Sequence, residues 1–324
     1  MPKNIARQFR KSDFSQRYLF GNLRQKKCLL PICWLWVYSK EQKEGIYMLQ
    51  LGPVYLNVLD LPRLSQFYQE VVGLSVLSKT KAQIVLGIQA DQRPLVILQQ
   101  ATQEDRQTAG LYHLAILVPT RLALSEVLHH LVQCGVALEG GADHGYSEAL
   151  YFHDLEGNGI EIYRDKPQNQ WDVRSDGRII GVTEELATQE IYDMISQAPK
   201  PFFLPQGTKM GHVHLAVGDA LASSKRYQAL LDMQEKHQYA KASWIASGSY
   251  HHHLAFNQWQ RRHTVHQDKQ AGLSKIGFVS DQAAELLAIA SRASKLGFQI
   301  KQQTTRQLQL LDTDGIAIQI DYQH

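Results

Sequence analysis

The chain has 324 residues, of which 44% are hydrophobic and 20% are charged, a composition typical of a globular protein with a sizeable core. Its formal net charge is only +3, and residues 1–47 hold an excess of seven positive charges, which leaves the remainder at −4. A mildly acidic body gives no reason to expect nucleic-acid binding. Three cysteines argue against a disulfide framework and favour a reducing cytoplasm.

The first 47 residues differ from the rest of the chain. Their apolar run CLLPICWLWVY, residues 28–38, is too short to cross a bilayer and contains a proline. Residues 1–47 are therefore expected to be a basic extension that is disordered or artefactual, and no membrane anchor is expected. Strand-like patterning begins in MLQLGPVYLNV, so the functional chain is expected to start at or near Met48.

From residue 53 onward the chain repeats one layout four times: a short strand, an amphipathic helix, then three more strands. The units run over about 53–100, 111–165, 211–259 and 273–322. Their predicted helices cover 61–74, 122–135, 221–233 and 283–297, and their predicted first strands cover 54–58, 112–118, 212–217 and 276–280. A polar linker over 166–208 contains prolines and one predicted helix within 184–195.

These patterns predict an α+β fold built from four βαβββ repeats. A four-stranded sheet with one helix leaves one face uncovered, so the units are expected to pair into two open, barrel-like mixed sheets with the helices outside. The predicted division is 48–165 for a first pair of repeats, 166–208 for the linker and 209–324 for a second pair.

The first strands of two units carry a histidine at the same position. When the strands are aligned on their last valine, His113 in unit two and His212 in unit three each lie five residues before that valine. The same alignment places Pro53 in unit one and Ser274 in unit four. Units two and three are therefore the ones expected to contribute ligands from this position.

The fourth strands of units two and four follow the same kind of turn. DLEGNGIEIY and DTDGIAIQID both open with an Asp-x-Glu/Asp-Gly signature, and Glu161 in the first stands where Gln319 stands in the second. Units two and three together thus supply His113, His212 and Glu161. Two histidines and one carboxylate form the facial triad of non-haem iron sites. The predicted metal is Fe(II), with Mn(II) as an alternative.

A third signal is the stretch SYHHHLAFN, residues 249–257, with three consecutive histidines. On a strand, neighbouring side chains point to opposite faces, so His251 and His253 would share one face and His252 would lie on the other. The three are therefore not expected to bind one ion together.

The segments GLYHLAILVP, DHGYSEALYFHDLEGNGIEIYRD, GHVHLAV and YHHHLAFN together carry a resemblance to a known family. Over about residues 50–322 the chain resembles the vicinal oxygen chelate superfamily, which includes glyoxalases, bleomycin resistance proteins and extradiol dioxygenases. Within it, the chain is most similar to bacterial catechol 2,3-dioxygenases. The resemblance implies extradiol ring cleavage, in which both atoms of O₂ enter a catechol-type substrate and give a muconic semialdehyde, as in aromatic hydrocarbon catabolism.

The resemblance also implies roles for individual residues. His113, His212 and Glu161 match the metal ligands of such dioxygenases. His252, three residues before Ala255, matches their acid/base histidine. Tyr151, ten residues before Glu161, and His144 upstream of it match a tyrosine and a histidine that contact substrate oxygens.

One departure from the family concerns pairing. In many two-domain members the last two repeats hold the metal, whereas here the ligands come from repeats two and three. We therefore expect repeat two to pair with three, and repeat one with four.

Two other functions remain open at this point. One is a different metal-dependent member of the superfamily, such as a glyoxalase-like isomerase or lyase. The other is a metal-free protein that binds small molecules and confers resistance. For an extradiol dioxygenase the expected partners are a catecholic substrate and O₂. No binding to nucleic acid or membrane is expected, and the expected location is the cytoplasm. Open sheet edges also point to self-association as a homo-oligomer.

Overall fold

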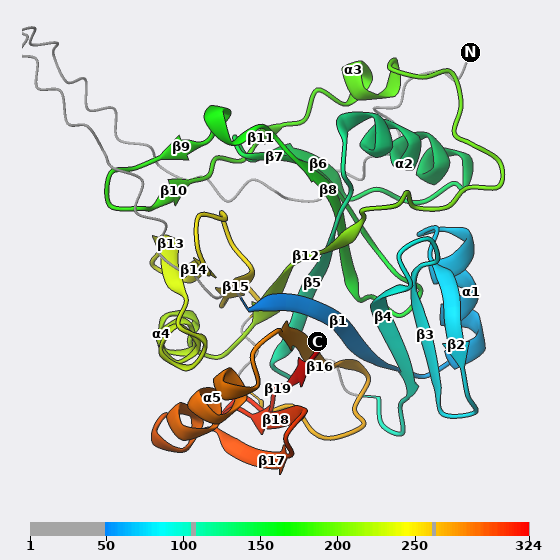
Figure 1. Cartoon of the computed structure of the whole chain (residues 1–324). Helices are drawn as coiled ribbons and strands as arrows, with labels where there is room; N and C mark the ends of the chain where they lie inside the picture. The colour runs from blue at the N-terminus through cyan, green and yellow to red at the C-terminus, as the bar shows by residue number, and fades with distance from the viewer. Residues whose placement is uncertain (1–48, 105–107, 261–263, 324) are drawn as a thin grey trace, which may run out of the picture.

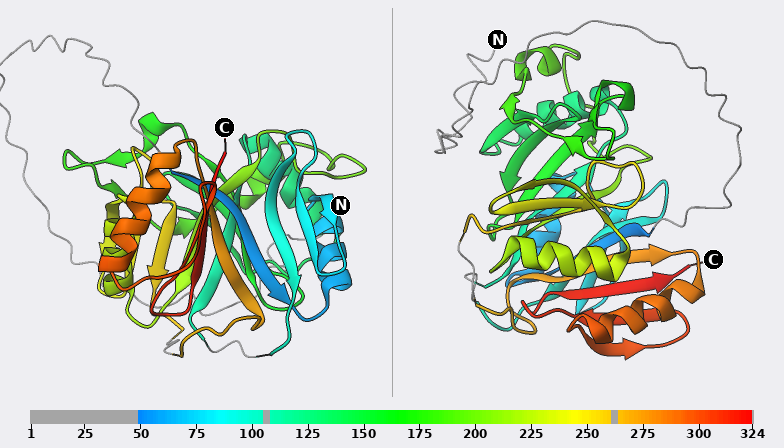
Figure 2. Two further views of the ribbon diagram at one scale, coloured as in Figure 1. Left: turned by 60° about the horizontal axis from the view of Figure 1, so that its bottom comes forward. Right: turned by 90° about the vertical axis from the view of Figure 1, so that its left-hand side faces the viewer.

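The computed structural model describes residues 49–104, 108–260 and 264–323 (Figure 1). The basic extension 1–47 and the expected start at Met48 lie outside the described residues. Two curved sheets form the body of the protein, and the larger helices lie on their outer surfaces (Figure 2).

The first sheet has eight strands in the order β17-β18-β19-β16-β1-β4-β3-β2. Unit one contributes β1 (Gln50–Val58), β2 (Ser75–Lys79), β3 (Gln83–Ile88) and β4 (Arg93–Gln100). Unit four contributes β16 (Gly272–Ser280), β17 (Gln299–Gln303), β18 (Gln307–Leu311) and β19 (Ala317–Tyr322). The antiparallel pair β1–β16 joins the two units.

The second sheet has nine strands in the order β11-β6-β7-β8-β5-β12-β15-β14-β13. Unit two contributes β5 (Gly110–Leu117), β6 (Gly140–Asp143), β7 (Ser147–His153) and β8 (Gly159–Asp165). Unit three contributes β12 (Lys209–Ala216), β13 (Gln234–Tyr239), β14 (Ala242–Ala246) and β15 (Leu254–Asn257). The antiparallel pair β5–β12 joins the two units.

This strand order confirms the predicted α+β fold and the predicted pairing of repeat two with three and of one with four. Inside each unit the first and fourth strands are parallel neighbours, as in β5–β8 and β12–β15. Each sheet thus draws on both halves of the chain, and the division into 48–165 and 209–324 stays a prediction.

Each unit has one helix, as the periodicity predicts: α1 (Leu61–Glu70), α2 (Arg121–Gln133), α4 (Ala220–Leu231) and α5 (Ala283–Lys295). Side-chain oxygens of Asp60, Thr120 and Asp219 accept from the first-turn amides and so cap the first three of these helices. The buried faces pack on the sheets through residues such as Leu64 and Leu128, neither of which is exposed.

The linker is less helical than its sequence suggests. Residues Glu184–Glu185 form the short strand β11, which pairs with β6, so α3 is confined to Thr188–Tyr192. Before it, β9 (Asp172–Val173) and β10 (Ile179–Ile180) form a small hairpin. The predicted helix over 184–195 is wrong in length, because its first residues pair with the edge strand β6 instead.

Consecutive units are also joined by two matching tyrosine–aspartate hydrogen bonds. Tyr68 on α1 donates to Asp154 at 3.1 Å, and Tyr227 on α4 donates to Asp312 at 2.8 Å. Both aspartates open the turn signature recognised in the sequence, and their other oxygen accepts from backbone amides of that turn. The turns therefore fix the fourth strands and also anchor the neighbouring helices.

Stability is expected to depend on pH through Asp312. Burial raises the pKa of this carboxyl in the folded protein to about 6, so folding favours its protonated form. The resulting stabilisation is fully present below the unfolded pKa and is lost as pH rises through 6. Asp312→Asn, which cannot ionise, should therefore become relatively more stable than the wild type by about 2 kcal/mol between pH 4 and pH 7. Urea unfolding of both proteins across this range measures the difference, and a pH-independent difference would contradict it.

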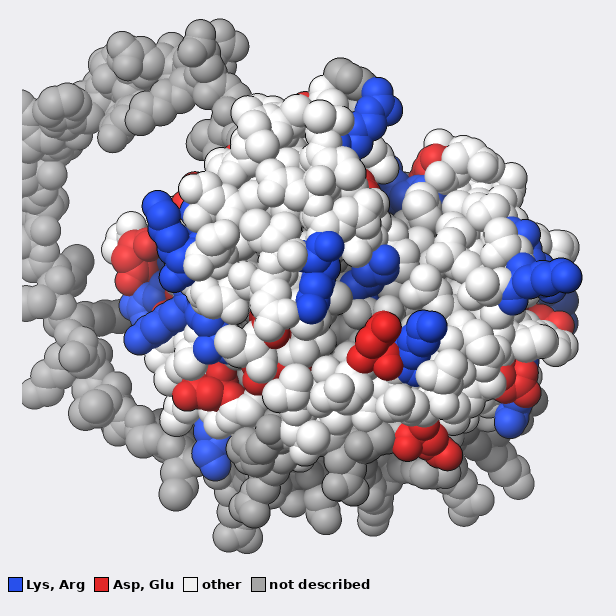
Figure 3. Space-filling view, turned by 90° about the horizontal axis from the view of Figure 1, so that it is seen from below, with Lys and Arg blue, Asp and Glu red and all other residues white. Residues whose placement is uncertain are grey.

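On the face seen in Figure 3, basic and acidic side chains are interspersed over mostly uncharged surface. Within residues 49–104, 108–260 and 264–323, no helix is long and apolar enough to cross a membrane.

Candidate metal centre

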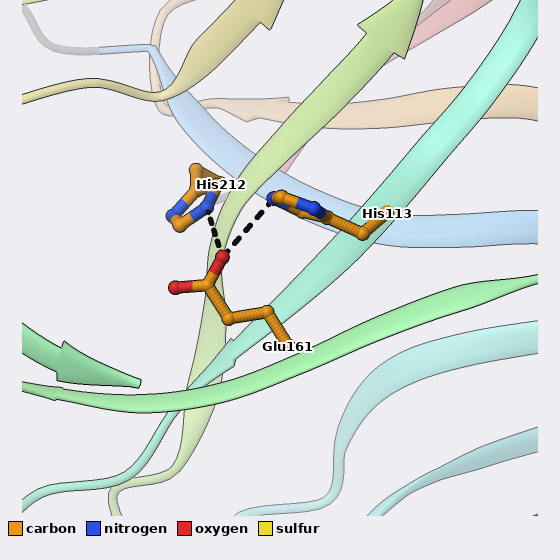
Figure 4. A group of neighbouring side chains, drawn as sticks. All are labelled: His113, Glu161 and His212. Atoms are coloured by element: carbon orange, nitrogen blue, oxygen red, sulfur yellow. Dashed lines mark hydrogen bonds and ion pairs between the residues drawn. The ribbon is translucent and has the colours of Figure 1, made fainter. Parts of the chain in front are cut away.

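Three buried side chains of the nine-stranded sheet converge: His113 from β5, Glu161 from β8 and His212 from β12 (Figure 4). Glu161 Oε2 lies 3.0 Å from His113 Nε2 and 3.1 Å from His212 Nε2. Strand register explains the meeting, because Ala115 of β5 lies opposite both Glu161 and His212. The structure thus brings together the three residues predicted from the sequence as ligands.

Irregularities in the β5–β12 pair aim these side chains. The register shifts between Met210 and His212, so Gly211 is an extra residue directly before a candidate ligand. A Cβ atom at Gly211 would lie 1.9 Å from the hydroxyl oxygen of Tyr163, which explains why glycine stands there. A second shift leaves Tyr112 as the extra residue before His113.

The ionisation of the cluster suits metal binding. Burial by itself would raise the pKa of Glu161, but the adjoining His212 and His113 outweigh it and hold that pKa well below its usual range. Burial lowers the pKa of His212 to about 4, against the opposing effect of Glu161. The site therefore offers an ionised carboxylate and a neutral imidazole, the forms that coordinate metals.

The geometry also fits a divalent ion. Two ligand atoms at right angles about an ion, each about 2.1 Å from it, lie about 3.0 Å apart, which matches the separations from Glu161 Oε2 to the two ring nitrogens. His113 Nε2 is buried and makes no aligned hydrogen bond despite the nearby carboxylate. A nitrogen in this position is available as a ligand.

His252 lies beside the cluster, with its ring centroid 4.1 Å from that of His212, and lines the cavity. Burial, followed by the nearby His212 and His251, lowers its pKa well below the usual value. The imidazole is therefore neutral and able to accept a proton from a substrate.

The prediction that His251, His252 and His253 alternate along a strand is wrong. β15 begins only at Leu254, and the three histidines lie in the bend before it. His251 and His252 consequently face each other, with their Nδ1 atoms 2.8 Å apart. His253 instead accepts from the amide of Ser247 at 3.3 Å.

Behind His252 lies a network that the sequence did not reveal. His251 Nε2 is 2.9 Å from Asp165 Oδ1, and Tyr250 donates to Asp165 Oδ2 at 3.1 Å. Burial lowers the pKa of His251 although Asp165 opposes it, so the ring is neutral. Because a carboxylate only accepts, Nε2 of His251 carries the hydrogen and its Nδ1 accepts from Nδ1–H of His252. The remaining nitrogen of His252, Nε2, is then left without a hydrogen.

Tyr151 and His144, the other predicted substrate contacts, also line the cavity and bind each other. Tyr151 Oη lies 2.7 Å from His144 Nε2, and His144 Nδ1 donates to the carbonyl of Val182 at 2.8 Å. Burial, with a further contribution from Glu161, raises the pKa of Tyr151 well above its usual value, so the phenol keeps its proton. Val182 belongs to the linker, which thus forms part of the cavity wall.

The first sheet shows which residues of unit four stand at the positions of the candidate ligands. Gly277 lies opposite Gln319 just as Ala115 lies opposite Glu161, so the residue equivalent to His113 is Lys275, two positions earlier. The prediction of Ser274 is wrong by one residue, because Ser274 falls at the register shift in β16. Lys275 Nζ donates to Gln319 at 2.8 Å, so an ammonium group stands where the other sheet has a candidate ligand.

Comparison with known proteins gives the class. Residues 50–162 and 209–320 match the profile of the Glyoxalase/Bleomycin resistance protein/Dioxygenase superfamily. The chain belongs to this superfamily.

The chain is 34% identical to catechol-2,3-dioxygenase of Bacillus subtilis (strain 168) over 259 residues, which cover 78% of this chain and 90% of that relative. Among solved structures, glyoxalase I from Zea mays has a TM-score of 0.52 at 15% identity, covering 85% of this chain and 92% of its own. The CppA protein of Streptococcus pneumoniae TIGR4 has a TM-score of 0.52 at 13% identity, covering 86% and 99%. These two structures share the fold.

Proposed function

We propose that the protein is an Fe(II)-dependent extradiol dioxygenase of the catechol 2,3-dioxygenase type. One observation carries the proposal: a buried carboxylate within 3.1 Å of two histidine nitrogens, in a chain similar to a catechol-2,3-dioxygenase over most of its length. His113, His212 and Glu161 would hold the metal. When bound, the iron would supply the reactivity toward O₂ and hold the two vicinal oxygens of the ring.

The residues around the cluster would serve the substrate. His252, neutral and with Nε2 free of hydrogen, would take a proton from a catechol hydroxyl as the substrate binds. Tyr151 would donate to a substrate oxygen or to His144, and so would orient the ring. These groups line one cavity of about 270 Å³ together with the candidate ligands.

The overall reaction balances without a further reductant. Both oxygen atoms of O₂ enter the substrate, and the ring bond beside the diol breaks to give an aldehyde and a carboxylate in one muconic semialdehyde. A glyoxalase-like isomerase would need no O₂. The two-histidine, one-carboxylate set among the described residues favours the dioxygenase.

The experiment is an anaerobic one. The purified protein is loaded with Fe(II) or Mn(II), mixed with catechol, and then given O₂. A yellow ring-fission product should form with one O₂ consumed for each catechol. If one iron is bound per chain and no substituted or unsubstituted catechol gives the chromophore, the dioxygenase proposal is wrong.

The remaining expectations are part of the same proposal. A catecholic small molecule and O₂ would be the partners, the protein would act in the cytoplasm, and the sheet edges would allow a homo-oligomer. Size-exclusion chromatography with light scattering tests the last of these.

A further inference from the structure

The linker between units two and three forms one wall of the cavity. Three consecutive linker residues, Gly181, Val182 and Thr183, line it, and we call them the linker strap. They lie outside residues 50–162 and 209–320, the two stretches that match the superfamily profile. A segment that this profile does not cover therefore contributes to the candidate active site.

Both ends of the linker strap are held in place. On one side, Ile179 of β10 is buried and packs in a cluster with Tyr146 and Trp171. On the other side, Glu184–Glu185 form β11, which pairs with β6 at the edge of the sheet (Figure 1). The linker strap therefore spans two anchored elements.

Close packing of Gly181 on Tyr146 sets the path of the linker strap. A Cβ atom at Gly181 would lie 2.8 Å from Cε1 of the Tyr146 ring and 3.0 Å from its hydroxyl oxygen, so only glycine allows the backbone to come this close. The ring is itself buried and stacks on His251, with the two centroids 4.3 Å apart. A side chain added at position 181 would therefore displace the strap rather than the ring.

Two hydrogen bonds join the linker strap to His144. The amide of Val182 donates to the carbonyl of His144 at 3.1 Å, and Nδ1 of His144 donates to the carbonyl of Val182 at 2.8 Å. Because a carbonyl oxygen only accepts, the second bond places the hydrogen of the neutral imidazole on Nδ1. Nε2 of the same ring is then an acceptor.

This acceptor nitrogen in turn orients Tyr151. Oη of Tyr151 lies 2.7 Å from Nε2 of His144, and with no hydrogen on that nitrogen the phenol has to donate to it. The lone pairs of Oη are then left for the cavity that Tyr151 lines. A hydroxyl hydrogen of a bound catechol matches such an acceptor.

We propose that the linker strap is a positioning element for the reaction: the carbonyl of Val182 fixes the tautomer of His144, and His144 turns the hydroxyl of Tyr151 so that its oxygen accepts from the substrate. This inference rests on the proposed function, because it concerns a substrate held at the metal centre. The linker then takes part in the site as well as connecting the two halves of the chain.

The tautomer can be measured without turnover. In the full-length protein labelled with ¹⁵N-histidine, before iron is added, NMR distinguishes ring nitrogens that carry a hydrogen from those that do not. Comparison with the spectrum of His144→Gln identifies the signals of His144. The wild type should show a hydrogen on Nδ1 of His144 and none on Nε2.

Gly181→Val should displace the linker strap and leave His144 as a mixture of tautomers. kcat for ring cleavage should fall by roughly tenfold, as for one lost hydrogen bond, while metal affinity stays unchanged. Gly140→Val is the matched control, because a Cβ atom at Gly140 on β6 would meet no heavy atom of the described residues within 4 Å. This control should keep both the tautomer and kcat. Gly181→Ala, which makes the same contact with less bulk, serves if thermal unfolding shows that the valine variant is not folded.

A double-mutant cycle separates positioning from lost packing. In a Tyr151→Phe background there is no hydroxyl to orient, so Gly181→Val should lower kcat by less than about twofold. Equal losses with and without the hydroxyl, or an unchanged His144 tautomer in Gly181→Val, would overturn the proposal. If the wild type cleaves no catechol, the dioxygenase proposal fails, and the NMR comparison alone then decides whether the linker strap fixes the tautomer.

Discussion

Glu161→Gln is expected to abolish tight metal binding and to lower kcat/KM for ring cleavage by roughly 10³-fold or more. The carboxylate is the one anionic donor of the cluster, and its Oε2 lies between the two ring nitrogens. An amide in its place has the same shape but no charge to neutralise a divalent ion. Gln319 stands at the position equivalent to Glu161 in the first sheet, and Lys275 stands at the position equivalent to His113. An amide is thus found at this position in the sheet where no metal is expected.

Metal binding can be measured independently of catalytic activity. Wild-type protein should bind one Fe(II) or Mn(II) per chain, and a metal concentration 100 times Kd should stabilise it by about 2.7 kcal/mol. The thermal shift should vanish in Glu161→Gln.

The matched control for the first prediction is Glu148→Gln. Glu148 is another buried carboxylate of the same sheet, but it pairs with Arg164 at 2.6 Å outside the cavity lining. This variant should lose stability and keep its metal. An unchanged metal stoichiometry and affinity in Glu161→Gln would show that Glu161 is not a ligand.

Periodicity was enough to predict the βαβββ units, because each strand and helix has to turn an apolar face toward the sheet core. The positions of the candidate ligands followed from the same regularity. His113 and His212 lie at equivalent places in units two and three, and Glu161 lies where unit four has Gln319. The pairing of unit two with unit three then brings the three residues together. Sequence therefore predicts those residues whose position is set by regular strands.

Irregular backbone is where the sequence was insufficient. The shift at Ser274 displaced the alignment by one residue and hid Lys275. The bend at His251–His253 has no strand periodicity, so the contact between two of its rings could not be foreseen. Asp165 meets His251 across 86 residues of sequence, and no local pattern marks such a pair. Tyr112 becomes a cavity residue only because a β-bulge turns it inward.

Asp165→Asn is expected to lower kcat by roughly 10²-fold while leaving metal affinity unchanged. The carboxylate makes Nε2 of His251 the protonated nitrogen, and His251 in turn makes Nδ1 of His252 the donor. An amide nitrogen at position 165 can donate to His251, which reverses both hydrogen bonds and puts a hydrogen on Nε2 of His252. In Ser-His-Asp triads, an Asp→Asn change that fixes the wrong tautomer costs about 10⁴ in kcat, and a smaller loss is expected here because a second imidazole intervenes.

The control for this second prediction separates the tautomer from the hydrogen-bond network as a whole. Tyr250→Phe removes the other hydrogen bond to Asp165, at 3.1 Å, but cannot reverse a donor, so kcat should fall by less than about tenfold. His251→Phe should resemble Asp165→Asn in kcat, because both deprive His252 of its acceptor. Steady-state kinetics gives kcat, and metal titration confirms that the iron is still bound. If Asp165→Asn and Tyr250→Phe lose the same small factor, Asp165 only packs against the loop, and His252 does not depend on it for its reactive form.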